Sequence, residues 1–119
     1  MKKSDREKIE QIIKSRKQAN SYYLNKSAVY RSFAKMEEAT YSDKALSKRQ
    51  KELIATGISI VINCESCMEW HIKQAIDNGA TENEILESIE VGIEMGGGPA
   101  TVSARFAMSV LEYYIESLK

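Results

Sequence analysis

The only two cysteines and the only histidine of this chain lie close together, in the stretch INCESCMEWH at residues 62–71. Cys64 and Cys67 are three residues apart, and His71 follows four residues later. Because an α-helix turns by about 100° per residue, this spacing places the three side chains on one face, within about 60° of one another. A thiol nucleophile, a nearby base and a second thiol that resolves the product are what dithiol redox chemistry needs. The cysteine spacing also permits a disulfide with little change in the backbone.

A helix that begins near Asn63 is needed to position these side chains. It would place Cys64 at its N-terminus and Cys67 in its first turn, where free N–H groups and the helix dipole favour a thiolate. His71 lies one turn after Cys67, so it is placed to exchange a proton with that thiol. The motif therefore favours a redox-active dithiol.

Two other interpretations of the motif remain open. Either the cysteines are a buried, unreactive pair beside an ordinary histidine, or the motif binds zinc with Glu52 or a water as the fourth ligand. A closed zinc site needs four ligands, usually with a second cysteine pair or paired histidines, and the chain has no further Cys or His. We therefore predict no metal ligands and no cofactor.

The preceding helix is expected to follow a capping box formed by Ser47 and Gln50, and its stretch KELIATGISIVI, residues 51–62, is apolar nearly all round. Such a helix is predicted to be buried. A polar stripe nevertheless follows it at helical spacing, comprising Glu52, Thr56, Ser59 and Asn63. Because buried polar groups need partners, the stripe is either a satisfied or solvent-facing structural feature or the wall of a polar pocket.

Cap and stop signals divide the rest of the chain into helices, and strand-like alternation is scarce. Helix starts are expected at Ser4, Ser27, Thr81 and Pro99, with breaks at residues 24–26, 40–46, 78–79 and 96–98. Apolar stripes at helical spacing comprise Val29, Phe33 and Met36 in the second helix, and Val102, Phe106, Val110 and Tyr113 in the last. The sequence predicts a single all-α domain of about six helices over residues 1–119, with the N-terminal helices in residues 1–40.

Charge is unevenly distributed along the chain, although the net charge is zero. Residues 1–51 hold 14 Lys and Arg against 6 Asp and Glu, and residues 52–119 hold 3 against 11, so the two parts carry +8 and −8. One interpretation is a basic arm for nucleic acid, with Tyr22, Tyr23 and Tyr30 as stacking groups. We favour the other, in which the basic part packs against the acidic part within or between subunits, since acids are interleaved with the bases.

Nothing in the sequence predicts a membrane segment. The N-terminus has charges but no following apolar stretch, and the longest apolar run, Ile58 to Ile62, is too short to span a bilayer. We therefore expect a cytoplasmic protein. Structural disulfides are rare in that compartment, where a close cysteine pair is more often catalytic or metal-binding.

The stretch from about Leu46 to Ala104, half of the chain, resembles the carboxymuconolactone decarboxylase-like family, and more closely its alkylhydroperoxidase AhpD-like branch. The resemblance rests on three motifs together: the KELIA helix start at 51–55, the cysteine pair with its histidine, and the GAT-x-x-EI turn at 79–85. It implies an all-helical AhpD-like fold that assembles as trimers or hexamers. It also implies a dithiol that reduces hydroperoxides or passes electrons to a peroxiredoxin.

By this resemblance Cys67 is the attacking thiol, Cys64 resolves it, and Glu52 and His71 form the proton relay. Glu52 occupies the family's glutamate position, twelve residues before the first cysteine. The resemblance therefore favours a polar stripe whose Glu52 faces the thiols. The chain departs from the family at Ser66, because the best-known AhpD proteins carry a histidine there, and one relay group is thus missing.

The expected function is a thiol-dependent oxidoreductase, an alkylhydroperoxidase-like peroxidase with a hydroperoxide substrate and an external dithiol or protein reductant. One alternative, motivated by Ser66, is a redox adaptor that exchanges disulfides with a peroxiredoxin-type partner. Another is a carboxymuconolactone decarboxylase-like lyase, although that branch does not rely on a cysteine pair. Residues 53–62 and 99–114 are more apolar than the outside of a monomer needs, so we also expect a homo-oligomer.

Overall fold

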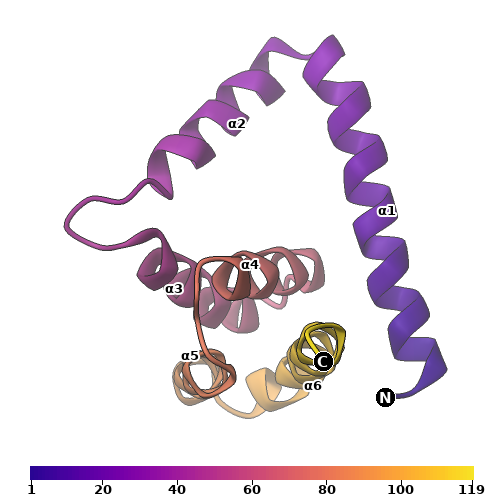
Figure 1. The fold of residues 1–119 in the computed structure, drawn as a ribbon, viewed down its shortest axis with the longest axis vertical. Helices are drawn as coiled ribbons and strands as arrows, with labels where there is room; N and C mark the ends of the chain where they lie inside the picture. The colour runs from indigo at the N-terminus through magenta and orange to yellow at the C-terminus, as the bar shows by residue number, and fades with distance from the viewer.

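Six helices and no strand make up the computed structural model, which describes residues 1–119 (Figure 1). They are α1 (Lys3–Lys26), α2 (Ala28–Thr40), α3 (Lys48–Val61), α4 (Glu65–Asp77), α5 (Glu82–Gly96) and α6 (Gly98–Ser117). The prediction of an all-α fold with about six helices is confirmed. None of the six is both long enough and apolar enough to cross a membrane.

Helices α3 to α6 pack against one another as a bundle, while α1 follows one side of it and α2 extends from the far end of α1 (Figure 1). The core holds 14 buried apolar side chains, and most of them come from α4, α5 and α6. Ile9 of α1 also reaches this core and is fully buried. Because burying one such side chain contributes roughly 1.5–3 kcal/mol, the core fixes α4, which carries the cysteine motif.

Two glycines allow α3 and α5 to pack closely. A Cβ atom at Gly92 would lie 2.6 Å from the carbonyl oxygen of Gly57 and 2.9 Å from Cβ of Ile60, so only glycine fits there without a shift. The close contact places the outward-facing apolar side chains of the two helices side by side.

Helix starts were predicted well except at the N-terminus. Ser27 accepts the Tyr30 N–H, and the capping boxes of Ser47 with Gln50 and of Thr81 with Glu84 are both present. The predicted start at Ser4 is wrong, because α1 begins at Lys3 with no side-chain cap. The Met1 amino group lies 3.2 Å from the Glu112 carboxylate of α6, which fixes the chain before Ser4 and lets the helix begin earlier.

In the single chain, helix α3 leaves its apolar side exposed. The prediction that this helix is buried is therefore wrong. Its buried residues are mostly the polar ones of the predicted stripe, namely Glu52, Thr56 and Ser59. Ile54, Ile58, Val61 and Ile62 are between 48% and 61% exposed. The reason is that the core lies on one side of α3 only, and no second layer covers the other.

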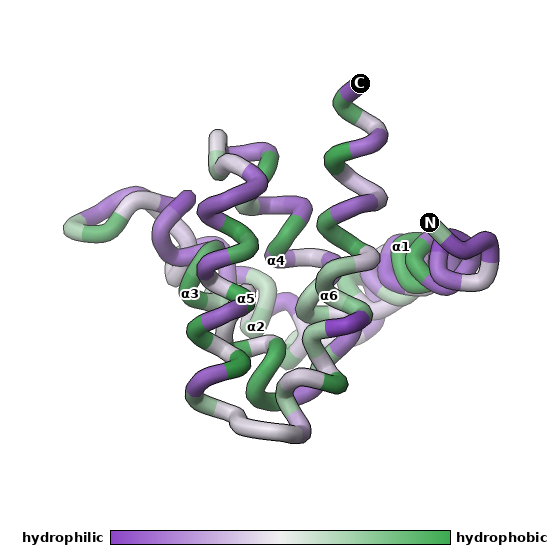
Figure 2. Tube along the Cα trace, turned by 90° about the horizontal axis from the view of Figure 1, so that it is seen from below, coloured by the Kyte–Doolittle hydropathy of each residue, from purple (hydrophilic) through white to green (hydrophobic).

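The apolar stripe of α2 is also exposed, and α2 packs against no helix other than α1. Val29, Phe33 and Met36 are 80%, 58% and 57% exposed. In the last helix Phe106 and Val110 are buried as predicted, but Val102 is 56% exposed. Figure 2 shows hydrophobic residues alternating with hydrophilic ones along α5.

Candidate active site

The turn between α3 and α4 sets the position of the cysteines. Asn63 adopts a left-handed backbone conformation with φ of 52°, which asparagine tolerates better than most residues. The Cys64 N–H then donates to the Ser59 carbonyl at 3.1 Å. As a result Cys64 becomes the N-cap of α4, and the helix begins at Glu65, two residues later than expected. Asn63 is therefore a turn residue rather than part of a polar wall.

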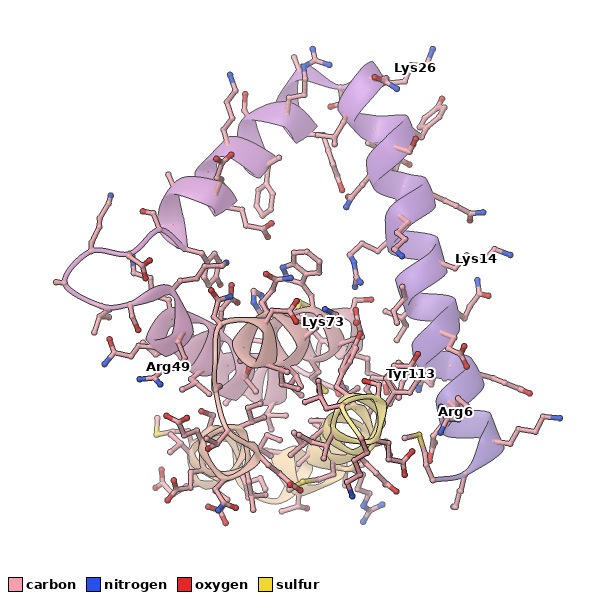
Figure 3. The ribbon with its side chains drawn as sticks, in the orientation of Figure 1. Arg6, Lys14, Lys26, Arg49, Lys73 and Tyr113 are labelled. Carbon is pink, nitrogen blue, oxygen red and sulfur yellow. A yellow bond between two sulfur atoms is a disulfide. The ribbon has the colours of Figure 1, made fainter.

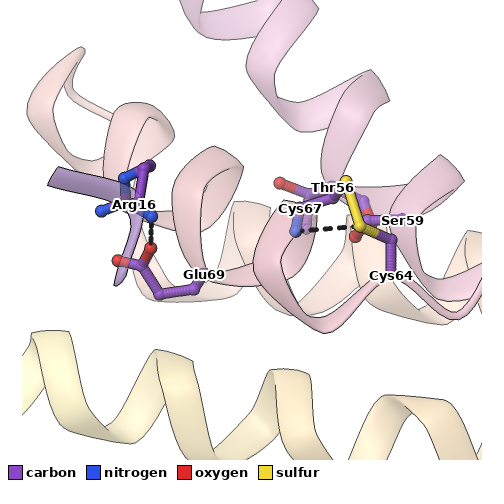
Figure 4. Close-up of a disulfide and its surroundings, with 6 residues drawn as sticks. All are labelled: Arg16, Thr56, Ser59, Cys64, Cys67 and Glu69. Carbon is purple, nitrogen blue, oxygen red and sulfur yellow. Dashed lines mark hydrogen bonds and ion pairs between the residues drawn. A yellow bond between two sulfur atoms is a disulfide. The ribbon is translucent and has the colours of Figure 1, made fainter. Parts of the chain in front are cut away.

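Cys64 and Cys67 are joined as a disulfide at the N-terminus of α4 (Figure 4). Their Cα atoms lie 5.2 Å apart. The Cys67 N–H donates to Sγ of Cys64 at 3.2 Å, in the manner of a helix cap. A negative charge on the Cys64 sulfur after reduction would be stabilised by this N–H and by the helix dipole.

His71 is held by a buried carboxylate. Its Nδ1 lies 2.7 Å from Oε1 of Glu52, whose side chain is only 1% exposed, and Oε2 of Glu52 accepts a hydrogen bond from Nζ of Lys48 at 2.8 Å. Burial raises the pKa of Glu52, but the hydrogen bonds from His71 and Lys48 outweigh it and hold the pKa below its usual value. Glu52 is therefore a carboxylate that fixes one ring nitrogen of His71 and leaves Nε2 free.

Tyr41 covers the His71 ring. The two ring centroids are 5.3 Å apart with an interplanar angle of 32°, and Nζ of Lys48 lies 5.5 Å from the Tyr41 centroid. Burial, and then the Glu52 and Glu37 carboxylates, raise the pKa of Tyr41, so its phenol stays protonated. Sequence reasoning missed both Tyr41 and Lys48. The i, i+4 spacing of Lys48 and Glu52 was a usable signal for Lys48, whereas Tyr41 follows α2 in a loop with no local signal.

Two cavities meet at Cys67 and His71. The first, of about 390 Å³, is here called the α3 cavity, and its wall is mainly apolar, with Ile54, Ile58 and Ile62 among its residues. The second, of about 280 Å³, is the α2 cavity, lined by residues of α1, α2 and α4 that include Arg16, Phe33 and Trp70. Cys67 lines both cavities and Cys64 lines neither. Of the two cysteines, Cys67 is therefore the one that a small molecule in either cavity would contact.

A buried ionic network lies on the opposite face of α4 from the disulfide (Figure 4). The fully buried Glu69 pairs with Arg16 of α1 and accepts a hydrogen bond from the Tyr114 hydroxyl of α6. The Arg16 guanidinium also lies over the Trp70 ring, 4.7 Å from its centroid. Burial and the Glu69 carboxylate raise the pKa of Tyr114, so it remains a hydrogen-bond donor. This network ties three helices together beside the motif.

The structure brings some of the predicted site residues together and gives others a structural role. Glu52 and His71 are in contact, and Cys67 lines the same cavities as His71. The hydroxyls of Thr56 and Ser59 donate to backbone carbonyls of α3 at 2.9 and 2.6 Å, so they are satisfied structurally, although Ser59 also borders the α3 cavity. No group of three or more His, Cys, Asp or Glu side chains converges as metal ligands would.

The protein is thus an all-helical bundle in which a cysteine pair lies at the start of one helix and a Glu–His pair lies nearby. The chain belongs to the carboxymuconolactone decarboxylase family, whose model matches residues 27–109. It is 40% identical over 80 residues to an uncharacterized protein of the cox locus of Paracoccus denitrificans. The matched segment covers 67% of this chain and 72% of that protein.

Solved structures of the same family have the same fold. A family protein from Legionella pneumophila superposes with a TM-score of 0.78 at 30% identity, covering 94% of this chain and 98% of that one. A family protein from Thermotoga maritima superposes with a TM-score of 0.82 at 24% identity, covering 89% and 91%. The matches span α1 to α6 for most of their length, so the arm formed by α1 and α2 belongs to the shared fold.

Proposed function

We propose that the protein is a thiol-dependent oxidoreductase that reduces hydroperoxides with the Cys64–Cys67 dithiol. The observation that carries the proposal is the position of Cys67, which lines two cavities together with His71, one helical turn away. The buried Glu52 carboxylate supports His71 from behind. The mainly apolar wall of the α3 cavity favours an organic hydroperoxide over hydrogen peroxide as substrate.

In the first step the Cys67 thiol gives its proton to His71, and the thiolate attacks the terminal oxygen of the hydroperoxide. The O–O bond breaks, an S–O bond forms, and the alkoxide takes the proton from His71 and leaves as the alcohol. Cys67 is then a sulfenic acid, so sulfur has been oxidised by two electrons and the peroxide reduced by two.

In the second step the Cys64 thiolate attacks the Cys67 sulfur. The S–S bond forms, the S–O bond breaks, and hydroxide leaves as water with the proton that Cys64 gave up. An external dithiol then attacks Sγ of Cys67, the cysteine that lines the cavities, and Cys64 leaves as a thiolate stabilised by the Cys67 N–H at 3.2 Å. The second thiol of the donor attacks its own sulfur in the resulting mixed disulfide, so Cys67 leaves as a thiolate and the donor leaves as a disulfide. The cap thus makes Cys64 both a good resolving nucleophile and a good leaving group.

The test is intact-protein mass spectrometry of the reduced chain mixed with one equivalent of an organic hydroperoxide and trapped with an alkylating reagent. We expect both alkylatable thiols to disappear together. In Cys67→Ser no thiol should be lost, while in Cys64→Ser one thiol should be lost and a sulfenic acid should accumulate. Full reactivity in Cys67→Ser, or a sulfenic acid there, would contradict the assigned roles.

A redox adaptor is the second candidate, and Ser66 is the observation that favours it. A histidine at this position would line the α2 cavity beside Cys67, as Ser66 does. Without that group direct peroxide reduction would be slow and exchange with a protein partner fast. In the same experiment, two thiols that persist with peroxide but are lost rapidly to an oxidised peroxiredoxin-type protein would favour the adaptor. Full function after alkylation of both thiols would favour a lyase.

A further inference from the structure

Two cavities border Cys67, and the proposed cycle brings two reactants to this residue, a hydroperoxide and a thiol reductant. Cys67 and His71 are the only residues that line both cavities. The mainly apolar α3 cavity suits the hydroperoxide. The α2 cavity is more polar, since its wall includes Arg16, Asn20 and Glu37. The chemistry of this wall indicates what the α2 cavity binds.

One side of the α2 cavity carries a guanidinium with free donors. Arg16 contacts the buried Glu69 through Nη1 and lies over the ring of Trp70, which lines the cavity as well. A guanidinium has five N–H donors, so this contact leaves donors for a second acceptor. Lys14 and Lys26, on the same helix, point away from the rest of the chain (Figure 3). Arg16 is the one Lys or Arg that lines the cavity.

The α2 side of the same cavity carries a carboxylate that has no cationic partner. Glu37 lines the cavity and takes part in none of the ion pairs of the chain. The neighbouring Glu38 is exposed and lines neither cavity. The α2 cavity therefore offers hydrogen-bond donors of a cation on its α1 side and an unpaired carboxylate on its α2 side.

We propose that the α2 cavity binds the reductant, and that the reductant is a small thiol carrying both an ammonium and a carboxylate group, of the class of cysteine and short cysteine-containing peptides. The ammonium group pairs with Glu37 and the carboxylate with Arg16, while the thiol lies against Cys67. A volume of about 280 Å³ lies at the lower limit of ligand pockets and suits a small molecule. Ser66 lines the same cavity and, being smaller than a histidine, leaves room for it.

Two molecules of such a thiol take the place of one external dithiol. The first attacks the Cys67 sulfur as a thiolate, the Cys64–Cys67 bond breaks, and Cys64 leaves and takes up the proton that the donor gave up. The second attacks the donor sulfur of the mixed disulfide, and Cys67 leaves as a thiolate. Two donor thiols become one disulfide, so two electrons pass to the protein. The inference rests on the proposed redox role of the cysteine pair, and it names the reductant and its site.

Four thiols of similar size test the recognition of charge. Cysteine carries both charged groups, cysteamine only the ammonium, 3-mercaptopropionate only the carboxylate, and 2-mercaptoethanol neither. The full chain with its disulfide formed is mixed with an excess of each thiol, quenched in acid and alkylated, and the remaining protein disulfide is measured by mass spectrometry. Each rate is divided by the thiolate fraction of that thiol, because the thiolate is the attacking species. We expect cysteine to react about tenfold faster than either singly charged thiol, and 2-mercaptoethanol to be slowest.

Glu37→Gln is the decisive variant, and Glu38→Gln is its matched control. Glu37→Gln removes the charge of the carboxylate and keeps its shape. We expect it to slow reduction by cysteine and by cysteamine about tenfold. Reduction by 3-mercaptopropionate and 2-mercaptoethanol should be no slower, since neither carries an ammonium group. Glu38→Gln removes the same charge one residue away, outside the cavity, and should slow none of the four reactions.

Equal rates for the four thiols in the unchanged chain, or no reduction by any of them, would overturn the proposal. An equal slowing of all four by Glu37→Gln would do the same, because it would give Glu37 a structural role only. So would a matching loss in Glu38→Gln, which would mean a long-range effect of charge. The assay starts from the disulfide and uses no peroxide. A failure here is therefore distinct from a failure of the reduced chain to lose its thiols to a hydroperoxide.

Discussion

The Glu52 side chain is deeply buried and has two hydrogen-bond partners. Its carboxylate contacts His71 through one oxygen and Lys48 through the other. A buried carboxylate is tolerated only when it is paired in this way. In the proposed mechanism the same pairing orients the imidazole so that Nε2 can exchange a proton with Cys67.

Glu52→Gln should lower stability in a pH-dependent manner. The pKa of Glu52 is lowered in the folded state, so its contribution is complete above the ordinary carboxyl pKa, about 4.3, and is lost as the pH falls through the lowered value. We expect the variant to be less stable by about 1–3 kcal/mol at neutral pH, and the difference to shrink in acid. Urea unfolding across this pH range measures it.

The same variant should slow the loss of thiols to an organic hydroperoxide by a factor on the order of 10², because the proton relay loses its support. Glu84→Gln is the matched control. Glu84 also has a lowered pKa, owing to its hydrogen bond to the Thr81 backbone, but it lies far from the cysteines in the cap of α5. An equal loss of rate in the control would show that Glu52 has no special role.

At the scale of helices, α4 carries the motif on one face and a structural anchor on another. Cys67 and His71 face the cavities, while Glu69 between them faces Arg16 of α1 and Tyr114 of α6. Within one to two turns of α4, residues that line the cavities therefore alternate with a residue that is bonded to α1 and α6.

Arg16→Met should destabilise the fold by about 3 kcal/mol, because it leaves the buried Glu69 carboxylate without its cation. Arg6→Met is the control, since Arg6 pairs with Glu116 on the exposed surface. Such a surface pair contributes only about 0–1 kcal/mol to the free energy of unfolding. Thermal or urea unfolding of both variants gives the comparison. Comparable losses of stability in the two variants would mean that the network around Glu69 contributes no more to stability than a surface ion pair.

At the scale of the whole molecule, we expect the fold to depend little on the disulfide. None of the 14 buried apolar side chains of the core belongs to the loop that Cys64 and Cys67 close. The two cysteines are separated by only three positions in the sequence. In the chain-entropy model so short a loop contributes only about 2 kcal/mol. We therefore expect the reduced protein to keep its helical circular dichroism, with a urea midpoint only modestly lower. Unfolding on reduction would be incompatible with a catalytic disulfide.

Much of the fold was predictable because its signals are local. The capping residues Ser27, Ser47 and Thr81 act within one helical turn, and so does the spacing of Cys64, Cys67 and His71. The contact of Glu52 with His71 came from the family resemblance. Tyr41 and Arg16 were missed because their partners lie in other helices, and sequence spacing alone carries no information on such contacts.

The burial of α3 was predicted wrongly for a related reason. Periodicity identifies an apolar face but not what covers it, and within one chain Ile54 and Ile58 are covered by nothing. Polar Thr56 and Ser59 can turn inward because their hydroxyls bond to their own helix.

Both cysteines among the 119 residues belong to one pair, and this sets a capacity. In the proposed mechanism the dithiol supplies two electrons, and the chain has no third cysteine to which a disulfide could be passed internally. Each turnover must therefore wait for a donor to reach the first turn of α4 from outside. Peroxide and reductant must then reach the same residue, Cys67, one after the other, through the two cavities that it lines.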